Sequence, residues 1–310
     1  MNDGVSVIIP TYNASKYVTK AIDSVLNQDY DNYEIIVVDD GSTDNTQEVL
    51  EKYGSKIKYI YQENGGPAKA RNTGIISSYE DYIAFLDADD LWLPGKLRKQ
   101  IDFFHRHPQY AMVYTDMKHA VNGKIVNSSY LKEGNYRYIS SGFIYENLLR
   151  ECFIFTPTVI VKRECLEKVG LFREDLRISE DYDLWLRIAD EYEIGFLDEP
   201  LVIRNRHGSN LTEDRYLYIT SCIQLFEELL EKNEGNRKRV KIIKEELAVR
   251  YFNLGYYLFE LGRLRESRYN FVKSLRYRYS NRSMIRALAS FLPKLWIDYI
   301  RRIRGIGYAK

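Results

Sequence analysis

The chain contains 310 residues with a mass of 36.6 kDa, and 45% of them are hydrophobic, which is enough to bury a core in one large domain or two smaller ones. This composition excludes a disordered or collagen-like chain. The 45 Lys and Arg residues and the 44 Asp and Glu residues leave a net charge of only +1, which argues against a protein built throughout to bind polyanions.

The charge is divided unevenly along the chain. Residues 231–310 contain 20 Lys and Arg against 7 Asp and Glu, whereas the first 230 residues carry a net charge of about −12. We therefore expect the two parts to meet different partners.

The cysteines indicate a reducing environment. Cys152, Cys165 and Cys222 are odd in number and form no CxxC pair. The first ten residues have neither the basic nor the apolar segment of a secretion signal, and no stretch approaches the roughly 18 consecutive apolar residues of a membrane span. These features predict a cytoplasmic protein.

The first 90 residues alternate apolar runs, which predict strands, with amphipathic stretches, which predict helices. We expect strands at 5–10, 33–38, 57–61 and 82–86 and helices at about 15–28, 44–53 and 67–76. Near-continuous apolar strands separated by helices are typical of a parallel sheet covered on both faces. The sequence therefore predicts a doubly wound α/β fold, whose first half spans residues 1–115.

The pattern changes from about residue 110 onward. We expect strands at 111–115, 158–162 and 195–205, a hairpin through 121–124, and helices at about 143–149, 164–169 and 182–192. This second half, residues 116–214, should share the same sheet and complete a domain over residues 1–214.

Residues 215–310 predict a basic helical region, with helices at 219–232, 239–261 and 264–277. The last two form a plain helical hairpin or, as the alternative, one tetratricopeptide-like pair. Residues 283–304 place aromatic and aliphatic side chains among Arg and Lys, and Pro293 should kink this segment. Residues 283–310 therefore fit the surface of an anionic membrane, or else pack on the preceding hairpin or on a second subunit of a homo-oligomer.

Polar loops follow the strands of the first half, at residues 10–13, 39–44, 63–67 and 87–90. Each loop taken alone fits an ordinary turn or helix cap. Because the carboxyl ends of strands in such a sheet share an edge, the carboxylates there would repel one another unless a cation binds. A divalent metal that carries a phosphorylated ligand would offset this repulsion.

Five motifs follow in order along residues 4–210: VSVIIPTYN, IIVVDDGSTD, NGGPAKARNTG, FLDADDLWLPGKL and SEDYDLWLRIA. Their order and spacing resemble the bacterial family 2 glycosyltransferases of the GT-A fold, which invert the anomeric carbon. The resemblance implies a nucleotide-sugar half and an acceptor half around one mixed sheet. It also implies a hexosyl- or N-acetylhexosaminyltransferase that moves a sugar from a nucleotide diphosphate sugar, with UDP favoured, to an acceptor hydroxyl in polysaccharide or glycolipid synthesis.

The resemblance implies a metal site at the DxD signature, which here reads Asp87, Ala88 and Asp89. By resemblance Asp89 is the direct ligand of Mn²⁺ or Mg²⁺, while Asp87 lies nearer the ribose or a metal-bound water. Oxygen ligands suit these hard cations. His207 matches a region that approaches the metal or the diphosphate in some relatives, and the alternative is a loop histidine that only makes hydrogen bonds.

The resemblance also implies the residues that bind the donor. Asp39 is expected to accept a hydrogen bond from the nucleotide base, and the ring of Tyr12 can stack on the same base. Lys69 and Arg71, which follow the glycine turn, can contact the base or offset diphosphate charge, although Lys69 also fits a surface salt bridge. The full expected donor set is Pro10, Thr11, Tyr12, Asn13, Asp39, Asp40, Gly66, Lys69, Arg71, Asp87 and Ala88.

Glu180 and Asp181 match the family's ED motif, in which the aspartate is the general base. Asp181 is thus the expected catalytic residue, and Glu180 is expected to bind the acceptor. Acidic residues also suit a helix N-terminus for electrostatic reasons alone, so the two roles are compatible. Trp185 could form a platform for the acceptor or belong to the core.

The partners implied are a nucleotide-sugar donor and a glycan or lipid-linked acceptor at the inner face of the plasma membrane, with no nucleic acid expected. A nucleotidyltransferase is one rival, although residues 10–14 lack the glycine-rich phosphate loop typical of that class. A catalytically silent scaffold of the same fold is the other rival, and the intact Asp89 and Asp181 positions argue against it.

Overall fold

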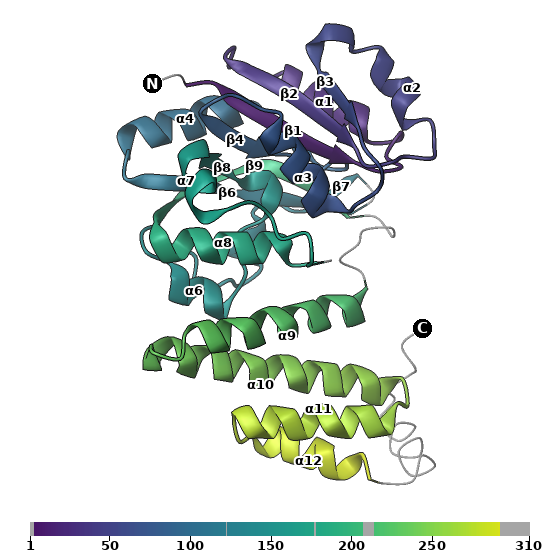
Figure 1. Cartoon of the computed structure of the whole chain (residues 1–310), viewed down its shortest axis with the longest axis vertical. Helices are drawn as coiled ribbons and strands as arrows, with labels where there is room; N and C mark the ends of the chain where they lie inside the picture. Colours follow the sequence, from purple (N-terminus) through teal and green to yellow (C-terminus); the bar gives the residue numbers. More distant parts are fainter. Residues whose placement is uncertain (1–2, 122, 177, 207–213, 292–310) are drawn as a thin grey trace. The chain divides into compact units, whose positions relative to one another are not determined.

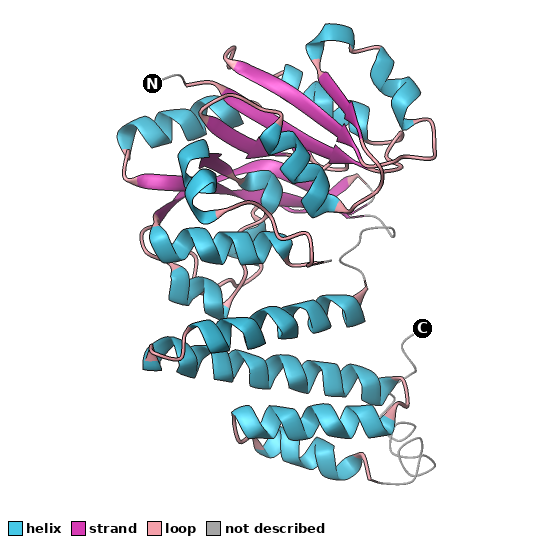
Figure 2. Cartoon of the chain, viewed as in Figure 1, coloured by secondary structure: helices cyan, strands magenta, loops and turns pink. Residues whose placement is uncertain are grey.

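The computed structural model describes residues 3–121, 123–176, 178–206 and 214–291 (Figures 1 and 2). The chain divides into two compact units, residues 1–210 and 211–310. The first unit is an α/β structure built on one sheet, and the second is helical.

The sheet of the first unit is mixed, with the order β3-β2-β1-β4-β8-β6-β9-β5 and β7 paired to β6. Its strands are β1 (Val5–Thr11), β2 (Tyr33–Asp39), β3 (Lys58–Tyr61), β4 (Tyr82–Phe85), β5 (Leu91–Trp92), β6 (Tyr110–Val121), β7 (Lys124–Asn127), β8 (Ile160–Lys162) and β9 (Glu193–Arg206). The pairs among β1 to β4 are parallel, whereas β8 runs antiparallel to both β4 and β6. The predicted doubly wound sheet shared by two halves is confirmed.

Helices cover both faces of this sheet, as Figure 2 shows. They are α1 (Val18–Leu26), α2 (Thr46–Glu51), α3 (Pro67–Ile76), α4 (Lys96–Arg106), α5 (Tyr130–Glu133), α6 (Tyr145–Arg150), α7 (Arg163–Val169) and α8 (Glu180–Glu191). One face buries side chains of α1, α2 and α4 in a single apolar cluster. The other face receives α3 and α8.

The alternation of side chains along β1 produces these two layers. Val5, Val7 and Ile9 point toward the cluster under α1, while Ile8 points the other way. A Cβ added to Gly74 of α3 would lie 2.4 Å from the Ile8 side chain, so the glycine allows α3 to approach the sheet closely. This close approach brings the start of α3 beside the loop that follows β2.

Several elements differ from the sequence prediction, and β5 and α5 were among those not predicted. The strand expected at 111–115 is much longer, because β6 pairs along its length with β9 and then turns through Gly123 into β7. The turn itself was predicted correctly. α4 was not predicted, although Leu97, Ile101 and Phe104 are buried at the spacing of a helix face.

The second unit consists of α9 (Arg215–Lys232), α10 (Arg237–Glu260), α11 (Leu264–Tyr277) and α12 (Asn281–Ala289). α10 and α11 form the predicted hairpin, which Gly262 closes with a φ of 75°. Gly255 lets α11 approach, since a Cβ there would lie 2.9 Å from the ring of Phe271. Within the described ranges no helix is both long and apolar enough to cross a membrane. Pro293 lies outside the described residues.

Candidate functional site

The parallel strands β1, β2 and β4 bring their polar ends to one edge of the sheet. Thr11 pairs with Asp39 in the register of β1 and β2, and the amide of Asp40 donates to the carbonyl of Thr11 at 2.8 Å. Residues 87–90 follow β4, which pairs with β1 on its other side. The loops that the sequence predicted to meet are therefore neighbours.

Asp39 is buried and held from two sides. Its Oδ1 accepts from the amide of Ser42 at 2.8 Å, and its Oδ2 accepts from the hydroxyl of Tyr59 at 3.0 Å. Burial raises the pKa of Tyr59, and the bond to Asp39 raises it further. Because each carboxylate oxygen can accept two hydrogen bonds, Asp39 retains acceptor capacity for a ligand.

The side chain of Asp40 holds the glycine turn in place. Its Oδ1 accepts from the amide of Gly65 at 2.9 Å and from the side chain of Gln62 at 2.6 Å, and its Oδ2 accepts from the amide of Gly66 at 2.8 Å. Gly66 has a φ of 88°, which a residue with a side chain rarely adopts. The Lys69 side chain lies along Gly65. In this geometry Asp40 shapes the turn that precedes α3.

Asn13 fastens the loop after β1 to the loop after β2. With a φ of 48°, it accepts from the amide of Thr43 at 2.7 Å and from the amide of Asp44 at 3.2 Å. Tyr12 beside it is 52% exposed, so its ring is open to a planar ligand. Pro10 is half-buried, and the buried hydroxyl of Thr11 has no hydrogen-bond partner within the described part of the chain.

Arg71 connects the DxD signature to the ED motif. Its Nη2 donates to Asp87 at 2.8 Å and its Nη1 donates to Glu180 at 2.7 Å, although these acids are separated by more than 90 residues. Arg71 is 6% exposed and lies over the ring of Phe172. Burial alone would lower its pKa, but Asp87 and Glu180 outweigh burial and raise it, so the guanidinium stays charged.

Asp87, Asp89 and Asp90 gather three carboxyl groups after the end of β4. Asp90 is buried, and the amide of Asn205 donates to its Oδ1 at 2.8 Å. Burial raises the pKa of Asp90 well above its ordinary value, and the charges of Asp89 and Asp87 raise it further. This excess of carboxylate oxygens fits a hard divalent cation.

Mg²⁺ and Mn²⁺ bound to a nucleotide need only one or two carboxylates from the protein, with phosphate oxygens completing the shell. In the described ranges no three His, Cys, Asp or Glu side chains are grouped as a complete metal site. Ala88, between the two aspartates, is buried. His207 lies outside the described residues.

Asp181 lies in the first turn of α8 and is half-buried. The hydroxyl of Thr156 donates to its Oδ2 at 2.9 Å, and the amide of Tyr182 donates to its Oδ1 at 2.7 Å. Ser179, the residue before the helix, has a φ of 75°, a strained conformation for a residue other than glycine. The carboxylate is thus fixed in orientation by its own helix and by a second segment.

The neighbouring Glu180 is buried, unlike Asp181. Burial raises the pKa of Glu180 to about 7, the charge of Asp181 raises it as well, and Arg71 acts in the opposite direction. This side chain accepts a hydrogen bond from Arg71, which links the first turn of α8 to α3.

The Trp185 ring is fully buried, 6.3 Å from the ring of Phe85 and 6.0 Å from the ring of Phe172. It belongs to the core between α8 and the sheet and has no exposed face for an acceptor. Of the two interpretations of this residue, the core position is the one observed.

Two contributors to this site were not predicted as site residues. Thr156 belongs to a short 3₁₀ turn, Thr156–Thr158, whose polar residues interrupt an otherwise apolar run. Asn72 exchanges hydrogen bonds with the backbone of Phe172 at 2.9 and 3.0 Å and thereby ties α3 to the segment before α8. The polar interruption was the available signal for Thr156.

Comparison with known proteins identifies the family. Residues 6–169 match the model of glycosyl transferase family 2, which is more than half of the chain. The chain belongs to glycosyl transferase family 2. A member from Escherichia coli, the UDP-Glc:alpha-D-GlcNAc-diphosphoundecaprenol beta-1,3-glucosyltransferase WfgD, is 36% identical over 197 residues, which cover 63% of this chain and 73% of that protein.

Two solved structures have a similar fold. TarS 1–349 of S. aureus in complex with UDP-GlcNAc superposes with a TM-score of 0.69 at 20% identity, covering 99% of this chain and 93% of that one. The mannosyltransferase PcManGT from Pyrobaculum calidifontis, in complex with GDP-Man and Mn²⁺, gives a TM-score of 0.63 at 17% identity over 95% of this chain and 82% of that one. These likenesses show the fold, and the GT-A fold expected from the motifs is confirmed.

The chain does not span all of its curated relatives. It covers 65% of the length of a relative from Rickettsia typhi and 33 to 40% of three relatives from other rickettsiae.

Proposed function

We propose that the protein is a metal-dependent, inverting glycosyltransferase that moves a sugar from a nucleotide diphosphate sugar to an acceptor hydroxyl. The observation that carries this proposal is the ion-pair bridge from Asp87 through Arg71 to Glu180, because it fixes the donor-side carboxylates relative to the start of α8. Family membership supports the same reaction class.

The donor nucleoside would lie over the loops that end β1 and β2. The exposed ring of Tyr12 offers a stacking surface, and Asp39, whose orientation is fixed, offers an acceptor for a base N–H. Asn13, Asp40 and Gly66 would act indirectly, because their hydrogen bonds hold the two loops and the turn in shape. UDP is the favoured nucleotide of the donor. The name of the E. coli relative supports this choice, because it gives UDP-Glc as the donor.

Asp89 would hold Mn²⁺ or Mg²⁺ at the donor diphosphate, and Asp87 would lie nearer the ribose or a metal-bound water. When bound, such an ion stabilises the charge of the departing nucleoside diphosphate. Arg71 would keep Asp87 oriented, while the charges of Asp89 and Asp87, which help to raise the pKa of Asp90, favour a cation at this edge. His207 stays a candidate for the same region by resemblance.

Asp181 would act as the general base. The acceptor hydroxyl attacks the anomeric carbon from the face opposite the leaving group, its proton passes to a carboxylate oxygen of Asp181, and the configuration inverts. Thr156 and the amide of Tyr182 support this role, since each holds one oxygen of the carboxylate in a fixed direction.

The acceptor would be a glycan or a lipid-linked sugar used in polysaccharide or glycolipid synthesis. The E. coli relative supports this choice, because its name gives a diphosphoundecaprenol-linked acceptor. Ile285, Leu288 and Phe291 are each more than 60% exposed along α12 and its end, so this part of the basic tail could lie on an anionic inner membrane surface. A peripheral position in the cytoplasm follows from that proposal.

A thermal-shift panel of nucleotide sugars, with and without Mn²⁺, tests the donor and metal proposals on wild type and on Asp89→Asn. We expect one nucleotide class to raise the melting temperature only when metal and Asp89 are both present. A transfer assay on Asp181→Asn then tests the base. The variant should keep the donor-induced shift and lose at least 100-fold in turnover, and retained turnover would remove Asp181 from the mechanism.

A nucleotidyltransferase and a silent scaffold are the competing functions. Nucleoside triphosphates added to the panel test the first, because a nucleotidyltransferase should be stabilised by them in preference to nucleotide sugars. A scaffold should show no turnover with any donor and acceptor pair.

A further inference from the structure

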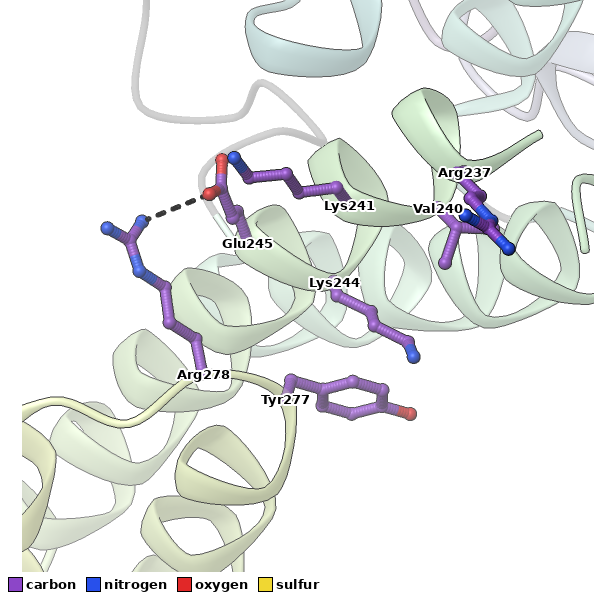
Figure 3. A pocket seen from close by; sticks show the side chains of 7 residues that line it. All are labelled: Arg237, Val240, Lys241, Lys244, Glu245, Tyr277 and Arg278. Carbon is purple, nitrogen blue, oxygen red and sulfur yellow. Dashed lines mark ion pairs between the residues drawn. The ribbon is translucent and has the colours of Figure 1, made fainter.

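The helical unit contains a pocket that no motif of the chain accounts for. It has a volume of about 350 Å³ and lies between the first half of α10 and the end of α11 (Figure 3). It lies outside the residues that match the family. Its lining residues are Arg237, Val240, Lys241, Lys244, Glu245, Tyr277 and Arg278.

Cations dominate the lining of this pocket. Arg237, Lys241 and Lys244 follow one another at intervals of four and three residues, so they share one face of α10. Arg278 adds a fourth cation from the end of α11, against the single carboxylate of Glu245. Like charges at these helical spacings repel one another, and a bound anion would offset this repulsion.

The charges in the pocket are only weakly compensated. Nη1 of Arg278 lies 3.8 Å from Oε1 of Glu245, which is longer than a good charge-assisted hydrogen bond, and the Arg278 side chain is 63% exposed. Among the residues that the structure describes, no acidic side chain lies within ion-pair distance of Arg237, Lys241 or Lys244. Arg237, Lys241 and Lys244 are therefore available to a ligand, and Arg278 is held only by its long contact with Glu245.

Tyr277, the aromatic residue of the pocket lining, contacts residues of two other helices. The hydroxyl of Tyr277 donates to Glu227 at 3.3 Å, and its ring stacks on Tyr251 with a centroid distance of 5.7 Å. Tyr251 also donates to Glu227, at 2.7 Å. Side chains of α9, α10 and α11 therefore all contribute to the position of the Tyr277 ring.

We propose that this pocket binds a phosphate or diphosphate group. Such a group brings several negative charges and acceptor oxygens, which suits the two guanidinium forks and two ammonium groups that two helices place around the pocket. The start of α10 at Arg237 adds the positive end of its helix dipole. A soluble phosphorylated compound and a phospholipid headgroup present the same chemistry, and the pocket volume leaves room for the molecule that carries either.

Isothermal titration of the full chain with inorganic pyrophosphate tests this proposal. The buffer contains EDTA, which withholds the divalent ion that the proposed donor site needs. The test variant is Lys241→Gln/Lys244→Gln, and the matched control is Lys238→Gln, which removes an exposed charge from the same helix without lining the pocket. We expect the double variant to bind pyrophosphate about tenfold more weakly and the control to bind within about twofold of wild type.

Equal binding by the double variant and wild type, or an equal loss in the Lys238→Gln control, would overturn the pocket assignment. Melting temperatures close to wild type would establish that both variants are folded. Sedimentation with phosphatidylglycerol vesicles distinguishes a phospholipid headgroup from a soluble phosphorylated compound as the ligand. Loss of vesicle binding in the double variant indicates a lipid headgroup, and loss of pyrophosphate binding alone indicates a soluble phosphate. Neither measurement depends on sugar transfer. A protein without the proposed transferase activity could therefore still bind phosphate at this pocket, and the two proposals can fail separately.

Discussion

The hydroxyl of Thr156 donates a hydrogen bond of 2.9 Å to Oδ2 of Asp181. The two residues come from different segments, a 3₁₀ turn beside β8 and the first turn of α8. A carboxylate with one oxygen held by a side chain and the other by an amide can present its remaining lone pairs in only a narrow range of directions. For a general base, that restriction favours the geometry in which the proton is transferred.

We expect Thr156→Val to lower the turnover number about tenfold while leaving the donor affinity unchanged. The substitution keeps the shape of the side chain and removes a charge-assisted hydrogen bond worth about 1.5–3 kcal/mol. Steady-state kinetics measure the effect. Thr158→Val is the matched control, because the hydroxyl of Thr158 donates to the carbonyl of Phe155 instead. Equal losses in the two variants would mean that the bond to Asp181 has no special part in the reaction.

Arg71→Met should destabilise the first unit by about 3 kcal/mol, because it leaves Asp87 and the buried Glu180 without their shared cation. Urea unfolding followed by tryptophan fluorescence measures the change. The control is Arg98→Met, which breaks a pair with Asp29 whose side chains are 50% and 58% exposed and which should cost less than about 1 kcal/mol. If both variants unfold at the same urea concentration, the bridge adds nothing beyond a surface ion pair.

The raised pKa of Glu180 predicts that the stability of the protein depends on pH. The folded-state pKa of Glu180 is raised to about 7 from an ordinary value of 4.5, so the folded protein holds a proton that the unfolded chain releases between these two values. Its contribution is therefore greatest below pH 4.5 and is lost as the pH rises toward 7. Over this interval the wild type should lose up to about 3 kcal/mol relative to Glu180→Gln.

The measurement is the difference in unfolding free energy between wild type and Glu180→Gln at several pH values from 4.5 to 7. The comparison is made as a difference because Asp90, whose pKa is also raised, titrates in both proteins. A difference that stays constant across this range would contradict a raised pKa at Glu180.

The strands of the sheet could be predicted from the sequence because β1, β2 and β4 are short apolar runs that end in turn residues. The length of β6 could not, because its second half is stabilised by pairing with β9, some 80 residues further along. Local pattern contains no information about such a partner.

The site was predictable to a similar degree. The carboxylates at the ends of strands could be located, since topology alone brings them to one edge. The use of each side chain could not be predicted, because it depends on neighbours distant in sequence. Asp40 holds the turn at Gly66, and Arg71 is shared between acids that follow β4 and open α8.

The exposed apolar side chains of α12 give the last prediction. Ile285 and Leu288 are 62% and 63% exposed on a helix whose Arg282 and Arg286 lie against aromatic rings of α10. We expect Ile285→Ser/Leu288→Ser in the full chain to reduce flotation with anionic vesicles severalfold, because the apolar area that enters the interface is lost. The matched control is Val249→Ser/Val272→Ser, which removes exposed apolar groups from α10 and α11. Wild-type flotation by the α12 variant, or none by the wild type itself, would direct the search to a protein partner or a second copy of this chain as the occupant of this face.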